Sequence, residues 1–261
     1  MLATLILGLF VFQEPAPKPD PGEAEPPKAE AEKGEQAEKP APKKVIEVWD
    51  DRRGKAAAAE FQKALKGKPS MRDRTKALEA LATGSSKHLI KPLQAIIEKD
   101  KSIVIRKLAA ELLGNQPADK ANPAIHKLMR SGKVTSYPVI HAELVRSLSR
   151  CGYAPKQWAE IQEEFERYYE LERVPLQEAL LELIIAHKEK QAIPMLLRNI
   201  DEPFAADPEA PGNPPAEYWE ARWKSWQVWR GKVKDALFAL TEQRFSTAAE
   251  AREWLKKNPL K

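Results

Sequence analysis

The sequence predicts an all-α fold built from repeated helix pairs, and three observations support this. From about residue 53 onward, apolar residues recur at intervals of three and four, which is typical of amphipathic helices. No stretch alternates convincingly with a period of two, so no sheet is expected. Glycine accounts for only 11 of 261 residues, fewer than in turn-rich β proteins. We therefore expect helices to supply the regular structure.

The helices form pairs that repeat along the chain. A single pair of 30–40 residues cannot bury its own apolar face, whereas stacked pairs share one continuous core. An additional helix at about 53–67 is expected to cap the stack, and an insertion at 201–216 lengthens the last repeat. The first helices of the five pairs align on Leu78, Leu108, Leu144, Leu180 and Leu237, with spacings of 30, 36, 36 and 57 residues.

Proline, glycine and small polar residues predict where these helices begin and end. Proline is tolerated in the first turn of a helix, and glycine commonly follows the last turn. The prolines expected near the starts of second helices are Pro92, Pro123, Pro155 and Pro194, and those near first helices are Pro138 and Pro175. The expected C-cap glycines are Gly84, Gly114 and Gly152, and the expected N-caps are Ser86, Ser102 and Thr247.

The pattern over about residues 70–258 resembles HEAT repeats. The resemblance is carried by first helices of the form AL-x-x-L, glycine breaks and proline-initiated second helices. The last unit, 236–258, is similar to the terminal unit of HEAT-repeat (armadillo-like) domains in exported bacterial proteins, through Leu240-Thr241, Phe245 and Trp254. The resemblance implies a right-handed α-solenoid of about five antiparallel helix pairs over residues 44–261. It implies no single activity, because HEAT domains serve many functions and mostly bind proteins.

The N-terminal residues differ in composition from the rest. Residues 1–12 are nearly all apolar, which is too short for a membrane span of ~20 residues but fits the core of a signal peptide. Neither a preceding basic residue nor an Ala-x-Ala cleavage site is present, so a signal peptide, an uncleaved anchor and an apolar cytoplasmic N-terminus remain open. Export to the periplasm, envelope or medium is the favoured prediction, with a cytoplasmic location as the alternative. Residues 13–43 are almost only Pro, Ala, Glu and Lys and predict a disordered linker.

The net charge of +5 conceals a strongly basic block. Residues 52–150 contain 21 basic and 8 acidic residues. This excess predicts a surface for an acidic protein or an anionic envelope polymer, and the alternative is a charged surface that only improves solubility. Whether the charges converge on the concave face of the second helices is left open. The candidate binding residues are Lys87, Lys91, Lys127 and Arg130 on second helices, and Arg72, Lys76, Arg106 and Lys107 on first helices.

A long helix at about 216–242 carries four tryptophans. Trp219, Trp223, Trp226 and Trp229 share a face with the apolar residues that follow them. This pattern predicts an aromatic core stripe, and the alternative is a platform that stacks on bases or sugars. Trp229 lies at the edge of the arc, so it is the candidate for an exposed, ligand-binding aromatic residue.

No pattern predicts catalysis, a metal site or a cofactor. The four histidines (His88, His126, His141 and His187) lack metal-ligand spacing, and Cys151 is expected to be a buried thiol. The glutamates of a predicted helix at 156–172 are expected to form a solvated face. We therefore predict a non-catalytic protein-interaction or scaffold module that acts outside the cytoplasm. The alternative is a nucleic-acid-binding HEAT-like protein of the alkylpurine DNA glycosylase type.

Overall fold

The structure, a computed structural model, describes residues 45–204, 210 and 212–259. The predicted signal segment (1–12), the predicted linker (13–43) and part of the insertion lie outside the described residues. Described regular structure is mostly helical, which confirms the all-α class. The helices are α1 (Asp51–Ala64), α2 (Met71–Glu79), α3 (Ile90–Lys99), α4 (Ile103–Leu113), α5 (Ala118–Met129), α6 (Gly132–Thr135), α7 (Pro138–Arg150), α8 (Trp158–Ile161), α9 (Glu163–Glu166), α10 (Val174–His187), α11 (Ile193–Asn199), α12 (Ala216–Thr241) and α13 (Ala248–Lys257). Short 3-10 turns are η1 (Lys87–Leu89), η2 (Pro155–Gln157), η3 (Leu171–Arg173) and η4 (Lys190–Ala192).

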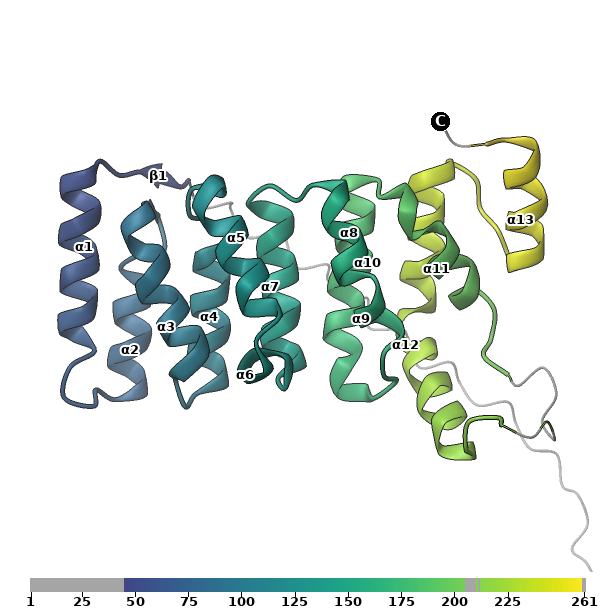
Figure 1. Ribbon diagram of the computed structural model, residues 1–261, viewed down its shortest axis with the longest axis horizontal. Helices are drawn as coiled ribbons and strands as arrows, with labels where there is room; N and C mark the ends of the chain where they lie inside the picture. The colour runs from purple at the N-terminus through teal and green to yellow at the C-terminus, as the bar shows by residue number, and fades with distance from the viewer. Residues whose placement is uncertain (1–44, 205–209, 211, 260–261) are drawn as a thin grey trace, which may run out of the picture. The chain divides into compact units, whose positions relative to one another are not determined.

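The first helices of the predicted pairs contact one another in chain order. Helix α2 packs against α4, α4 against α7, α7 against α10, and α10 against α12 (Figure 1). Each second helix packs against the first helix that follows it, as α3 does with α4, α5 with α7, α9 with α10, and α11 with α12. The leucines of successive repeats share one core, in which Leu78, Leu144, Leu180 and Leu237 are all buried. Contacts between these successive helices therefore bury their apolar stripes in one shared core.

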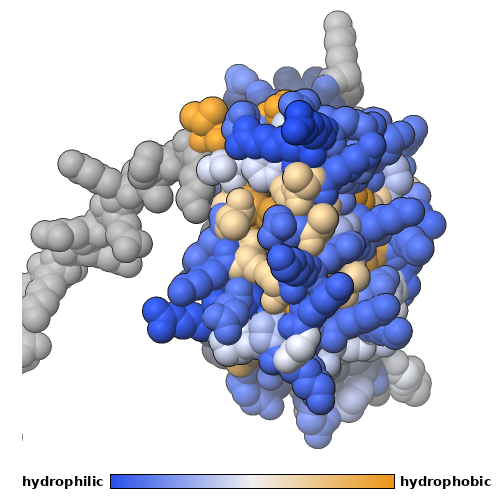
Figure 2. Space-filling view, turned by 90° about the vertical axis from the view of Figure 1, so that its left-hand side faces the viewer, coloured by the Kyte–Doolittle hydropathy of each residue, from blue (hydrophilic) through white to orange (hydrophobic). Residues whose placement is uncertain are grey.

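Helix α1 covers the N-terminal end of this row. It begins two residues before the predicted start because the carboxylate of Asp50 accepts a hydrogen bond from the amide of Arg53 at 2.7 Å. Only Gly54 and Phe61 of α1 are buried. Figure 2 shows that this end of the unit is mostly hydrophilic, with a moderately hydrophobic patch (pale orange) near its centre. A charged outer face of this kind is what a terminal element of a helix stack requires.

A two-strand pairing corrects the expectation of no sheet. Strand β1 (Glu47–Val48) pairs in parallel with β2 (Gly84–Ser85). A strand of two residues is too short to produce an alternating pattern, so the sequence carries no signal for it. Gly84 is therefore not a helix C-cap: the indole of Trp49 occupies the space where a Cβ at this position would lie.

Most of the residues predicted to begin or end helices do so in the structure, with one exception among the prolines. Pro138 is the first residue of α7, Pro175 and Pro194 are second residues of their helices, and Thr247 caps α13 by accepting from the Glu250 amide at 3.2 Å. Pro123 instead lies inside α5. The amide of Ala121 already donates to the carbonyl of Pro117, so a full turn forms before Pro123 is reached. Gly152 follows the end of α7 with a φ of +106°, as expected for a C-cap glycine.

Gly114 permits a close approach between α4 and α7. It ends α4 with ordinary right-handed backbone, so the left-handed conformation is not what requires glycine there. A Cβ at this position would lie 2.8 Å from the Cα of Ser147. Gly114→Ala is therefore expected to reduce the free energy of unfolding by about 2 kcal/mol, the cost of overpacking a close contact.

Urea denaturation followed by circular dichroism measures this change. Gly231→Ala is the matched control, because Gly231 lies within α12 and no atom stands within 4 Å of a Cβ placed there. The control is expected to stabilise the chain by about 1 kcal/mol through helix propensity. Equal effects of the two substitutions would contradict the close packing of α4 on α7.

None of the helices in the described part of the chain combines the length and the apolar character that a membrane span needs. Helix α12 has 26 residues but carries charged side chains along most of its length.

Candidate functional site

Lysines of α3 and α5 meet in a groove between these helices. The hydroxyl of Ser86 accepts from the amide of His88 at 3.4 Å, which begins η1 and positions Lys87 just before α3. The groove has a volume of about 590 Å³. Four lysines line it, namely Lys87, Lys91, Lys120 and Lys127. Lys120 is not among the predicted binding residues. The sequence predicts that this second helix begins near Pro123, whereas α5 begins at Ala118.

Two of these four lysines carry charge that no described carboxylate neutralises. Lys87 lies 2.8 Å from a carboxylate oxygen of Asp51, and hydrogen bonding to Lys87 and His88 lowers the pKa of Asp51 to about 2. Lys120 forms an ion pair of 3.3 Å with its neighbour Asp119. Lys91 from α3 and Lys127 from α5 are exposed, and within the described residues neither forms an ion pair. The groove therefore offers positive charge to a ligand from both of its walls.

The remaining predicted basic residues do not line this groove. Arg130 forms an ion pair with Glu160 at 2.7 Å and lines the next cavity along the second helices. Arg72 and Lys76 are exposed on α2, and Lys107 is exposed on α4. The structure thus brings together Lys87, Lys91 and Lys127 and leaves the residues of the first helices apart.

Arg106 corrects the prediction of a surface role. Its side chain is buried, and its guanidinium donates to the carbonyls of Ile97 and Lys133, both at 2.6 Å. The same group lies over the ring of Tyr137. The carbonyl of Ile97 belongs to the last turn of α3, where backbone acceptors lack helical partners. Arg106 therefore holds helix ends together and is not available to an acidic ligand.

Trp229 is also buried, which contradicts its predicted exposure. Its indole N–H donates to the side-chain oxygen of Gln177 at 3.0 Å, and its ring meets the edge of Phe165. The periodicity of α12 considers one contact face, whereas Trp229 is covered by residues of two other helices, Gln177 of α10 and Phe165 of α9. The predicted core stripe is confirmed for Trp226 and Trp229, so Trp229 cannot stack on a base or a sugar.

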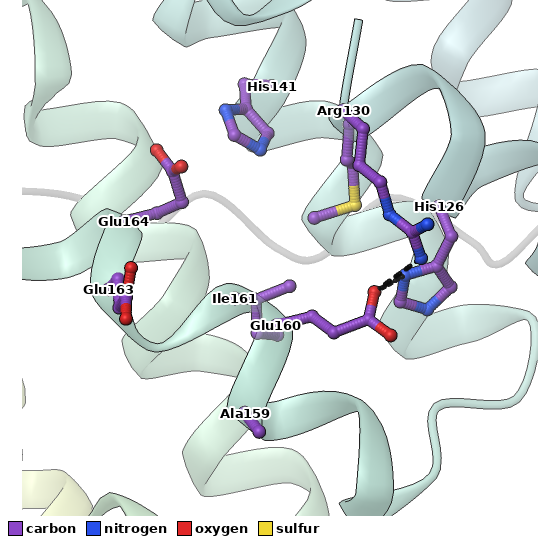
Figure 3. Close-up of a pocket in the computed structure, with 9 residues that line it drawn as sticks. His126, Arg130, His141, Ala159, Glu160, Ile161, Glu163 and Glu164 are labelled. Carbon is purple, nitrogen blue, oxygen red and sulfur yellow. Dashed lines mark hydrogen bonds and ion pairs between the residues drawn. The ribbon is translucent and has the colours of Figure 1, made fainter.

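A second cavity, which the sequence did not predict, lies beside the lysine groove. It has a volume of about 470 Å³ and contains side chains from α5, α7, α8 and α9 (Figure 3). Its polar lining consists of His126, Arg130, His141, Glu160, Glu163 and Glu164, and Met129 and Ile161 supply apolar wall. Figure 3 shows these side chains arranged around one open space, with the ring of His141 directed into it.

Both ring nitrogens of His141, which lines this cavity, lack hydrogen-bond partners among the described residues. His141 is 1% exposed. Burial lowers the pKa of His141 to about 4, so the imidazole is neutral at pH 7. His126 on the opposite wall lies 3.4 Å from Glu160, and burial lowers its pKa as well.

The predicted helix at 156–172 is interrupted, and this places its glutamates at the cavity. The segment forms η2, α8 and α9 instead of one helix. Glu164 is largely buried and pairs with Arg173 at 3.0 Å and Arg167 at 2.8 Å, so the expectation of a fully solvated acidic face is wrong for this residue. Glu163 is exposed at the cavity and has no ion pair within the described residues. Helical periodicity accounts for the i,i+3 pair with Arg167 but carries no signal for the pair with Arg173, nine residues away.

No group of three or more His, Cys, Asp or Glu side chains in the described part of the chain is arranged to hold a metal ion. Cys151 is buried, and burial raises the pKa of its thiol to about 11. Comparison of the chain with protein-family models, curated proteins and solved structures finds no significant match in any of the three.

Proposed function

We propose that the chain is a HEAT-like, right-handed α-solenoid of five helix pairs and a capping helix, which acts as a non-catalytic protein-interaction module. Its second helices bind an acidic segment of a partner protein in the groove between α3 and α5. Location outside the cytoplasm is part of this proposal and rests on the composition of residues 1–43. The observation that carries the binding proposal is the convergence of Lys87, Lys91, Lys120 and Lys127 on one groove.

The charge balance of the groove supports an anionic ligand. Lys91 and Lys127 face it from different helices and are not ion-paired with any described residue. An acidic segment in the groove gains two new ion pairs without breaking existing ones. Clustered positive charge also speeds the encounter with an acidic partner, an effect that salt weakens.

Charge reversal at Lys91 and Lys127 tests the proposal. The double variant Lys91→Glu with Lys127→Glu replaces two attractions by two repulsions, four terms of about 0.5 kcal/mol each for exposed charges. The expected loss is about 2 kcal/mol, or about 30-fold in Kd for a fluorescein-labelled oligoglutamate peptide measured by anisotropy.

Arg72→Glu with Lys107→Glu is the matched control. These residues are equally basic and exposed but lie on α2 and α4, outside the groove. The control is expected to change Kd by less than about threefold, since only the long-range field is altered. Equal losses in the two variants would show that net charge, and not the groove, attracts the peptide. Tighter binding of heparin or duplex DNA than of the peptide at 0.15 M salt (a Debye length of about 8 Å) would also overturn the proposal.

A further inference from the structure

An intermediate cavity lies between the lysine groove and the second cavity. Pro123 and Lys127 line both the lysine groove and this intermediate cavity of about 460 Å³ between α5 and α8. His126, Arg130 and Glu160 line both this intermediate cavity and the one that contains His141. The three cavities therefore form a row of neighbours along the second helices, with shared side chains between them. Their lining is basic at the α3 end and rich in carboxylates at the α9 end.

The unused hydrogen-bonding capacity at the acidic end defines the chemistry of a ligand there. Glu160 and Glu164 already pair with arginines, whereas Glu163 has no pair in the described part of the chain. A carboxylate only accepts hydrogen bonds, and a neutral imidazole presents one acceptor nitrogen. A positively charged group with several N–H donors and an aliphatic stem fits this lining, because Met129 and Ile161 provide an apolar wall for the stem.

We infer that the cavity lined by His141, Glu163 and Glu164 receives the ammonium group of a lysine side chain from the partner segment whose acidic part occupies the lysine groove. This inference rests on the proposed function. The ammonium donates to Glu163 and Glu164, and the imidazole of His141 accepts at the floor of the cavity. The partner segment therefore carries opposite charges at its two ends, in a fixed direction relative to the helices.

The geometry of helix packing sets the spacing within that segment. Adjacent packed helices lie about 8–10 Å apart, and an extended chain advances about 3.3 Å per residue. About three residues therefore separate the acidic run from the lysine.

Two peptides that differ in one group test the inference. The first contains a glutamate run, a spacer of about three residues and one lysine, and the second has norleucine in place of the lysine. The lysine peptide is expected to bind about fivefold more tightly, as one partly exposed ion pair provides. It is also expected to shift the NMR signal of the His141 ring without shifting that of the exposed His187.

Glu163→Gln removes the free carboxylate from an exposed position and is expected to abolish the advantage of lysine over norleucine. Glu170→Gln is the matched control, because Glu170 is exposed and lines a different cavity. This control is expected to leave unchanged the fivefold ratio between the Kd values of the norleucine and lysine peptides.

The outcomes separate this inference from the proposed function. If both peptides bind equally and charge reversal at Lys91 and Lys127 still weakens both, the lysine pocket is refuted and the groove stands. If neither peptide binds, both proposals fail together. A titration with n-butylammonium, the side chain of lysine alone, distinguishes the source of the ammonium. A shift of the His141 signal by this amine, with no advantage for the lysine peptide, would assign the cavity to a free amine and overturn the inference.

Discussion

Trp229→Ala is expected to lower the free energy of unfolding by about 4 kcal/mol, the typical cost of truncating a fully buried aromatic side chain. Trp229 is 0% exposed, and its ring meets Phe165 with a centroid separation of 5.0 Å. The substitution leaves a cavity where α12 packs against α10. It also removes the donor to the side-chain oxygen of Gln177, a buried amide that has no access to replacement water.

Two further variants separate these contributions in a guanidinium denaturation experiment. Trp229→Phe keeps most of the apolar volume but loses the indole N–H, and it is expected to cost about 2 kcal/mol, chiefly for the unsatisfied Gln177. Trp223→Ala is the comparison on the same helix, because Trp223 is only half-buried. Its expected cost is about 1 kcal/mol, in keeping with an incompletely buried side chain. A loss at Trp229 no larger than at Trp223 would place Trp229 at the surface after all.

The burial of Trp229 illustrates what a helix's own periodicity can and cannot predict. The spacing of Trp226, Val233 and Leu237 correctly identifies one buried face of α12. Trp229 lies at the edge of that arc and is covered through a contact with Phe165, 64 residues earlier in the chain. The position of a second neighbouring helix is a tertiary property, and no local pattern encodes it.

Charged residues show the same contrast between what the local sequence pattern predicts and what tertiary contacts determine. The spacing of Lys91 and Lys127 relative to their apolar stripes predicts that they are exposed, and both are exposed. Arg106 has an equally polar side chain but fills a site between helix ends, where the carbonyls of Ile97 and Lys133 accept hydrogen bonds from its guanidinium. Pairing of Glu164 with Arg173 depends in the same way on an interruption in the helix that carries it. The composition of the sequence therefore identifies the basic block, whereas tertiary contacts determine which of its basic side chains a ligand can reach.

The histidine at the second cavity gives the largest expected pH effect on stability. Burial keeps the His141 imidazole neutral in the folded chain and lowers its pKa to about 4, against 6.5 for an unperturbed histidine. The groups that face it are charged residues of α9 and the segment leading to α10. Burial is the largest effect and disfavours the protonated form, as do Arg173 and Arg167, whereas Glu164 alone favours it. Glu160, Glu163 and Arg130 line the rest of the cavity, and His126 faces it from α5.

The sign of the pH dependence follows from proton binding in the two states. Between pH 6.5 and 4, the unfolded chain binds a proton at His141 and the folded chain does not, so unfolding is favoured as the pH falls. The stability is fully present above pH 6.5 and is lost progressively toward pH 4. A shift of this size corresponds to about 3 kcal/mol, at 1.36 kcal/mol per pKa unit.

His141→Leu removes the titrating group while keeping an apolar side chain in the core. Urea denaturation at several pH values from 7 to 4 measures the free energy of unfolding of both proteins. Between pH 7 and pH 4, the wild type is expected to lose about 3 kcal/mol more of this free energy than the variant, because the other titrating groups are common to both. His187→Leu, at an exposed histidine, is the matched control and is expected to follow the wild-type curve. If His141→Leu and the wild type lose stability in parallel, the imidazole titrates in the folded chain as it does in the unfolded chain, and burial does not keep it neutral. A wild type that gains stability relative to the variant as the pH falls would show that the folded chain holds the imidazole protonated. A cationic imidazole would repel an ammonium group, so the same measurement also tests the premise that His141 accepts a hydrogen bond from a partner's lysine.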